Sequence, residues 1–194
     1  MRLHCEHVIP LDADAFWAVI HAPEYEALVA EALGLREYRE LERREERGAL
    51  YRRIQVAPEL PAALRALLRR AAGLESASYV EEQWRSRARR EVRFRLVPSV
   101  LPGRSRIEGR VRVEPRDDSS CTRILEGVVE VGVPVLGRLL ERAIVANAVE
   151  GYGKSAAVVA RLGPPTTPGS PPRRRRSRSP SRPSTSGSAR AGRR

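Results

Sequence analysis

The chain has 194 residues and a formal net charge of +12, and this charge is concentrated at one end. Residues 163–194 contain nine arginines and no acidic residue, so removing them leaves residues 1–162 at about +3. The sequence pI near 11.0 therefore describes a basic tail and not a uniformly basic globular surface. About 160 residues are enough for one domain with a sizeable core.

Composition excludes several classes of protein. Two cysteines, Cys5 and Cys121, cannot make a disulfide framework or a metal site by themselves, and we expect both to be small buried hydrophobic residues. The polar N-terminus does not resemble a signal peptide, and no apolar run is long enough for a transmembrane helix. We therefore expect a reduced, cytoplasmic, monomeric protein without a metal or other cofactor.

Hydrophobic periodicity predicts both strands and helices over residues 2–162. Arg2–Ile9 alternates like a strand, and two short helices follow: Ala13–His21, with Asp12 as its N-cap, and Pro23–Leu33. Six further strands and one short helix come next. Their ranges are 35–45, 49–56, 78–87, 89–97, 104–114 and 121–132 for the strands and 60–72 for the helix. The last element is a long helix over Pro134–Leu162.

Most of the predicted strands have one apolar and one charged face, which indicates an antiparallel sheet covered on one side only. Gly109 and Gly127 fall on the covered face, where strongly bent sheets often have a glycine. In the strand over 78–87, the alternation places Val80, Glu82 and Trp84 on that same face. These assignments predict which side chains meet the interior.

The closing helix carries one apolar stripe, so we expect it to lie against the concave face of the sheet, where a pocket often remains. Gly151 and Gly153 interrupt the helix and predict a bend or a close approach near its middle. The stripe consists of Leu136, Leu140, Ile144, Ala148, Tyr152, Ala156 and Val159.

Three segments resemble the START-like superfamily, also called SRPBCC. HVIPLDADAFWAVIHAPEY (7–25) is similar to its opening, with a strand, a helix that contains a tryptophan, and a proline before the next helix. ELPAALRALLRRAAGLESASYVEEQW (59–84) is the second match, and IEGRVRVEP with VVEVGVPVLGRLLERAI is the third. Together they are most similar to an uncharacterised, mainly actinobacterial branch of that superfamily. The resemblance covers residues 2–162 and leaves out residues 163–194.

The resemblance implies an α+β, helix-grip fold: a curved seven-stranded antiparallel sheet wrapped around the long C-terminal helix. It also implies a cavity between them, which in the superfamily holds sterols, phospholipids, polyketides or plant hormones. Fold alone does not choose among these ligands. We expect the cavity to be lined by His7, Trp17, Arg52, Glu82, Trp84, Phe94, Val111, Val129, Leu140, Ile144, Ala148 and Tyr152.

Two alternatives concern these side chains. Arg52 and Glu82 either orient a ligand or pair with each other, because an unpaired buried charge is costly. The aromatic residues either line the cavity or serve ordinary core packing. The leading hypothesis is a non-catalytic domain that binds or transfers a hydrophobic, lipid- or sterol-like ligand.

An enzymatic interpretation finds little support in the sequence. No nucleophile motif, metal-ligand spacing or phosphate-binding loop is present. Some START-like proteins are cyclases or hydrolases that use acids and bases of the cavity, and Glu82 with His7 is the pair that would serve here. We therefore keep such an enzyme as an alternative.

The basic tail suggests a further function, through nucleic acid or an import receptor. It is too polar to bury a core, so we expect it to be disordered. Its compact cluster is Arg173, Arg174, Arg175 and Arg176, followed by Arg178. Phosphates on Ser177, Ser179 or Ser181 would offset that charge. A regulatory or RNA-associated protein, cytoplasmic or nuclear, is the alternative, and a compositional by-product of a GC-rich coding sequence is the simpler explanation.

Overall fold

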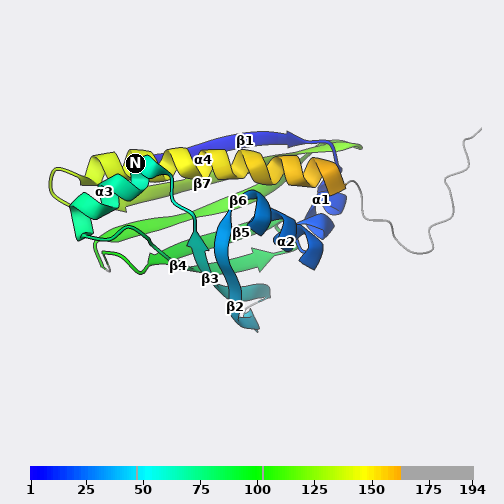
Figure 1. The fold of residues 1–194 in the computed structure, drawn as a ribbon. Helices are drawn as coiled ribbons and strands as arrows, with labels where there is room; N and C mark the ends of the chain where they lie inside the picture. Colours follow the sequence, from blue (N-terminus) through cyan, green and yellow to red (C-terminus); the bar gives the residue numbers. More distant parts are fainter. Residues whose placement is uncertain (47, 102, 163–194) are drawn as a thin grey trace, which may run out of the picture.

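One antiparallel sheet and one long helix make up most of the described chain (Figure 1). The computed structural model describes residues 1–46, 48–101 and 103–162. The predictions made for the basic tail lie outside these residues. The order of elements is the predicted one, and the α+β helix-grip architecture is confirmed.

The bounds of the elements differ from the predicted ones by a few residues at the ends. The strands are β1 (Arg2–Ile9), β2 (Leu35–Glu46), β3 (Ala49–Pro58), β4 (Tyr79–Ser86), β5 (Glu91–Pro98), β6 (Ser105–Asp117) and β7 (Ser120–Val131). The helices are α1 (Ala13–Val19), α2 (Pro23–Ala32), α3 (Ala62–Ala72) and α4 (Gly137–Leu162).

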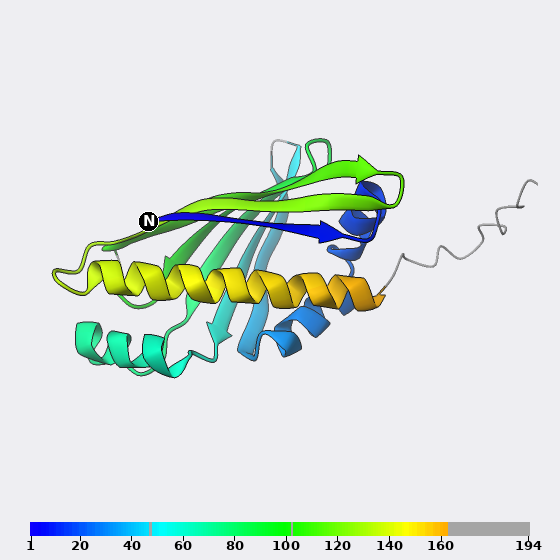
Figure 2. The same cartoon turned by 90° about the horizontal axis from the view of Figure 1, so that it is seen from above.

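The sheet has the strand order β1-β7-β6-β5-β4-β3-β2, with every neighbouring pair antiparallel. Strands β2 to β7 therefore follow one another along the sheet, and β1 returns to pair with β7. Helix α4 crosses the concave side of the sheet, with α3 beside it at one end and α1 and α2 at the other (Figure 2).

The ends of the helices follow local sequence signals. Asp12 caps α1, because its carboxylate oxygen accepts hydrogen bonds from the backbone N–H of Asp14 and Ala15 at 3.0 and 2.9 Å. Helix α4 begins at Gly137 and not at Pro134, since Val135 adopts a left-handed conformation with φ of 64°. A Cβ on Gly137 would lie 2.3 Å from the carbonyl oxygen of Val131, so only glycine fits there.

The apolar core is divided along α4 into two larger clusters and a smaller one. Around α1 the core contains Phe16 and Trp17, and around α3 it contains Leu64, Leu68 and Leu140. The third cluster joins residues of β1, β6 and β7 to the middle of α4. The middle of α4 therefore faces the sheet between two well-packed ends.

Gly109 of β6 and Gly127 of β7 are direct partners in the sheet, on its covered face. A Cβ on Gly109 would lie 2.2 Å from the carbonyl oxygen of Glu126 and 2.9 Å from the ring of Phe94. A Cβ on Gly127 would lie 2.7 Å from the carbonyl oxygen of Glu108. No side chain can be accommodated, so the predicted need for glycine at this point of the sheet has a steric cause.

Gly151 and Gly153 do not break α4, which is continuous from Gly137 to Leu162. A Cβ on Gly151 would meet Leu33 at 3.4 Å, and one on Gly153 would meet the imidazole of His7 at 3.8 Å. Both distances are ordinary van der Waals contacts, so neither position requires a glycine for steric reasons.

Candidate ligand cavity

A cavity of about 360 Å³ lies between the concave face of the sheet and helices α2 and α4. A second chamber of about 120 Å³ adjoins it and shares Tyr25, Glu81, Phe94, Arg123 and Tyr152 with it. Small-molecule sites typically measure about 300–1,000 Å³, so the larger chamber is of ligand-binding size.

One part of the larger chamber is apolar. Aliphatic side chains from six strands and two helices form it. They are Leu3, Val29, Leu33, Leu35, Val56, Leu96, Ile107, Leu125, Val129, Ile144 and Ala148. This part offers a surface for a hydrophobic body but no group that would orient it.

One polar wall comes from β4, whose Tyr79, Glu81, Gln83 and Arg85 all point into the cavity. The sequence prediction for this strand is therefore wrong by one residue, because Glu82 and Trp84 lie on the opposite, outer face. A shift of one position along a strand moves every side chain to the other side of the sheet. Glu82 instead forms ion pairs with Arg95 and Arg53 of the neighbouring strands.

The misassignment has a physical reason. Strand β4 carries charges on both faces, and its tryptophan suggested a buried side. In the structure the ring of Trp84 packs against Tyr51 at 5.3 Å between centroids, on the outer face, where the guanidinium of Arg44 lies 4.2 Å from the Tyr51 ring. The Trp84 ring therefore finds an aromatic packing partner on the outer face of the sheet, outside the core.

Arg52 lies inward as predicted and is only 2% exposed, but its partners differ from the expected one. It donates to Glu26 of α2, with 3.0 Å between Nη2 and Oε2, and also to Glu40 of β2. Arg43 also donates a hydrogen bond of 2.8 Å to Glu40, and Arg85 donates one of 3.3 Å to Glu26. A chain of alternating charges therefore fixes α2 to the sheet.

The same network sets the protonation of Glu26. Burial acts to raise the pKa of its carboxyl group, but hydrogen bonds and charges from Arg52 and Arg85 outweigh burial and lower the pKa. Glu26 is therefore a carboxylate, and Arg52 and Arg85 compensate its charge.

Unlike Glu26, Glu81 has no compensating cation, since none of the described basic side chains lies within 4.0 Å of its carboxyl group. Its oxygen Oε1 accepts a hydrogen bond of 2.6 Å from Gln83, which in turn accepts one of 2.8 Å from Arg85. Burial raises the pKa of Glu81. Burial likewise raises the pKa values of Tyr38 and Tyr79, which line the cavity nearby. This wall therefore offers hydrogen-bonding groups whose protonated forms are favoured by burial, beside the guanidinium of Arg85.

Arg123 of β7 faces the cavity from the other side and was not predicted. It is 4% exposed and donates to the hydroxyl of Ser155 at 2.9 Å and to the carbonyl of Tyr152 at 2.5 Å. Its guanidinium also lies 4.5 Å from the centroid of the Tyr152 ring. The signal was available, because Arg123 shares the inward positions of β7 with Cys121 and Leu125.

Half of the predicted lining residues do border the cavity. Phe94, Val129, Ile144, Ala148 and Tyr152 line the larger chamber, and Val111 lines the smaller one. Whether these side chains contact a ligand remains a prediction.

The other predicted residues lie elsewhere. Trp17 and Leu140 are packed in the core clusters at the two ends of α4. His7 faces α4 from the edge strand β1, so it is on the inner side of the sheet, whereas Glu82 is on the outer side. The acid–base pair considered for an enzyme is therefore not assembled.

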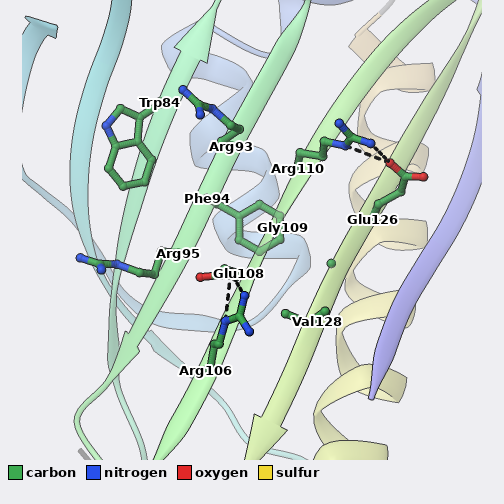
Figure 3. Close-up of a pocket in the computed structure, with 11 residues that line it drawn as sticks. Trp84, Arg93, Phe94, Arg95, Arg106, Glu108, Gly109, Arg110, Glu126 and Val128 are labelled. Atoms are coloured by element: carbon green, nitrogen blue, oxygen red, sulfur yellow. Dashed lines mark hydrogen bonds and ion pairs between the residues drawn. The ribbon is translucent and has the colours of Figure 1, made fainter. Parts of the chain in front are cut away.

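The outer face of the sheet carries a shallow groove lined by Trp84 and by several arginines and glutamates (Figure 3). Its charges are paired with one another: Arg110 lies 3.0 Å from Glu126, and Nε of Arg106 lies 3.0 Å from Glu108. This arrangement is the expected state of a solvated face. The groove holds no unpaired charge that would select a ligand.

Among residues 1–46, 48–101 and 103–162 no group of His, Cys, Asp and Glu side chains could hold a metal ion. No helix in this part of the chain is both long enough and apolar enough to cross a membrane. Cys5 and Cys121 are free thiols. Cys121 is fully buried as predicted, whereas Cys5 is only half-buried.

Residues 4–162 match the family described as "Protein of unknown function (DUF2505)", and the chain belongs to that family. Among curated proteins nothing matches the sequence.

Solved structures with the same fold were found at low sequence identity. The Zhui aromatase/cyclase from Streptomyces sp. R1128 has a TM-score of 0.58 and 17% identity, over 83% of this chain and 95% of that one. A START superfamily protein from Mycobacterium smegmatis has a TM-score of 0.55 and 14% identity, over 83% and 98%. Norcoclaurine synthase from Thalictrum flavum has a TM-score of 0.58 and 14% identity, over 84% and 85%. These similarities confirm the START-like fold that the sequence predicted.

Proposed function

We propose that the protein binds a small hydrophobic ligand in the cavity between the sheet and helices α2 and α4. The observation that carries this proposal is the chamber of about 360 Å³ with an aliphatic part and a polar wall. Pockets of this size with few polar groups among apolar ones are the usual form of small-molecule sites. Binding or transfer, without chemical conversion, is the function that this lining supports best.

The size of the chamber restricts the ligand. Its volume is near the lower end of the range for small-molecule sites, which favours a compact apolar molecule or a single-chain lipid over a two-chain phospholipid. The lining is mainly aliphatic and suits a flexible body, since the aliphatic side chains outnumber the five aromatic rings. These rings belong to Tyr25, Tyr38, Tyr79, Phe94 and Tyr152.

One structural neighbour supports a compact ligand. Norcoclaurine synthase was solved in complex with dopamine and hydroxybenzaldehyde, which are small aromatic molecules. The shared fold therefore accommodates small molecules in that protein. Because fold does not determine function, the proposal for this chain rests on its own cavity.

Binding can be tested with the neutral fluorescent probe N-phenyl-1-naphthylamine, whose emission increases in an apolar site. We expect saturable binding of one probe per chain, and native mass spectrometry of protein purified from its own host should detect a co-purifying small molecule. The absence of both would refute the proposal.

A matched pair of variants locates the site. Ala148 lines the cavity, whereas Ala146 is exposed on the same helix. Ala148→Phe should fill the chamber and weaken probe binding by about tenfold or more, the equivalent of about 1.4 kcal/mol. Ala146→Phe should leave binding unchanged. Equal effects of the two substitutions on the probe, with both proteins folded by circular dichroism, would place the binding site outside the cavity.

A further inference from the structure

Arg123 is a buried cation without a counter-charge. The polar side chains with the lowest solvent exposure in the described chain are those of Arg52, Arg123 and Ser155, at 2%, 4% and 7%. Arg52 is compensated by Glu26 and by Glu40. For Arg123, no carboxylate of the described residues lies within 4.0 Å.

The groups that face Arg123 from β1, α2 and α4 are neutral, and the carboxyl group of Glu81 on β4, which lines both chambers with Arg123, lies more than 4.0 Å from it. The hydroxyl of Ser155 and the carbonyl of Tyr152, both on α4, accept hydrogen bonds from Arg123. Tyr25 of α2 lies nearby: burial raises the pKa of its hydroxyl, and Arg123 and Ser155 lower that pKa by less. His7 of β1 is the direct strand partner of Arg123, and burial together with the guanidinium charge lowers the pKa of the imidazole. None of the groups on β1, α2 and α4 supplies a negative charge to Arg123 at neutral pH.

This arrangement is costly for the folded protein. A buried ion requires a partner of opposite charge, and neutral acceptors compensate only part of the lost hydration. The contacts of Arg123 hold the guanidinium in one orientation but leave its Nε–H without an acceptor in the described chain. Because Arg123 lines both chambers, an anion inside the cavity can reach it.

We propose that Arg123 anchors the ligand by pairing with an anionic group, so that the cavity selects small apolar carboxylates. This inference rests on the proposed function and names its ligand class. A guanidinium presents parallel N–H groups that match a carboxylate in a bidentate manner. The apolar body of such a ligand would lie along Leu125 and Val129, which follow Arg123 on the same face of β7.

The test compares two competitors of equal chain length, octanoate and 1-octanol, that displace N-phenyl-1-naphthylamine at about pH 7.5, where octanoate is ionised. Without an anchor, octanol is the better competitor, because a carboxylate loses more hydration on entering an apolar site. With the anchor, we expect octanoate to displace the probe at a concentration at least about tenfold lower than octanol.

Three variants assign this preference to the residue. Arg123→Met should abolish the preference for octanoate while the neutral probe still binds, and Arg123→Lys should restore part of it. Arg138→Met, which removes an exposed arginine of α4, is the matched control and should behave as the wild type.

Thermal unfolding distinguishes a ligand anchor from a purely structural role of Arg123. Removing Arg123 leaves no buried carboxylate behind, and Ser155 keeps its own hydrogen bond to the carbonyl of Tyr152 at 2.9 Å. Arg123→Met should therefore unfold at the same temperature as the wild type or at a higher one. A large loss of thermal stability, or an octanoate preference that survives Arg123→Met, would overturn the anchor and leave the cavity function intact. If the neutral probe does not bind the wild type at all, the proposed function itself fails.

Discussion

The two faces of the sheet use arginine in opposite ways. On the outer face, Arg110 is about half exposed and its partner Glu126 about one-third exposed, so water already solvates both charges. On the inner face, Arg52 is 2% exposed and its partners Glu26 and Glu40 are partly covered. An exposed pair contributes little to stability, whereas breaking a buried pair leaves a charge that nothing hydrates. Position on the sheet, and not residue type, decides what each arginine contributes.

The largest effect should come from the inner pair. Arg52→Met leaves Glu26 with Arg85 alone and Glu40 with Arg43 alone. We expect the free energy of unfolding to fall by about 3 kcal/mol, the usual cost of removing one partner from a buried ion pair. Urea denaturation followed by circular dichroism measures this difference. A loss of less than about 1 kcal/mol would mean that solvent reaches Glu26 and Glu40 as easily as it reaches the outer face.

An intermediate effect is expected at Glu81, and it should depend on pH. Burial raises the pKa of Glu81 above its ordinary value of 4.5, so folding favours the protonated carboxyl group. The stability that depends on this proton is complete below about pH 4.5 and is lost as the pH rises through the raised pKa. Glu81→Gln cannot ionise, so it should equal the wild type at low pH and exceed it above neutrality by on the order of 1 kcal/mol.

The neighbouring residue provides the control for this experiment. Glu82 lies on the outer face and pairs with Arg95 at 2.6 Å. Glu82→Gln should lower stability slightly at neutral pH, opposite in sign to Glu81→Gln. Thermal melts of both variants across the pH range test the pair, and a pH-independent effect at Glu81 would contradict a pKa raised by burial.

The smallest effect should come from the outer pair. Arg110→Met removes one of two arginines that contact Glu126, and Arg112 remains at 3.4 Å from it. We expect a change within about 0.5 kcal/mol, which should shrink further at high salt. A loss comparable with that of Arg52→Met would remove the contrast between the two faces.

The sequence predicted the element order and most of the sheet faces, because these depend on strong periodicity. In β6, Ile107 and Val111 alternate with charged residues, which fixes the inward face of the strand. The stripe of α4 likewise placed Ile144, Ala148 and Tyr152 at the cavity.

The polar wall of the cavity could not be predicted in the same way. Strand β4 has polar residues on both faces, so hydrophobic alternation does not show which face is buried. Trp84 indicated the wrong face. The partners of Arg52 come from α2 and β2, which are far from it in sequence, so only the tertiary structure brings them together. Arg123 occupies a regular inward position in β7, but the sequence alone does not show that a charged residue at such a position is buried.

Strand β2 ends the sheet opposite to β1, and its composition bears on how the protein behaves at high concentration. All but three of its twelve residues are charged, and two β-bulges interrupt its pairing with β3. An unpaired strand edge is a template on which another chain can add a strand, and charges and bulges are the features that prevent this addition. Strand β2 therefore protects the sheet from edge-to-edge aggregation, and replacing Arg39 with valine at this edge should lower the concentration at which the protein remains in solution.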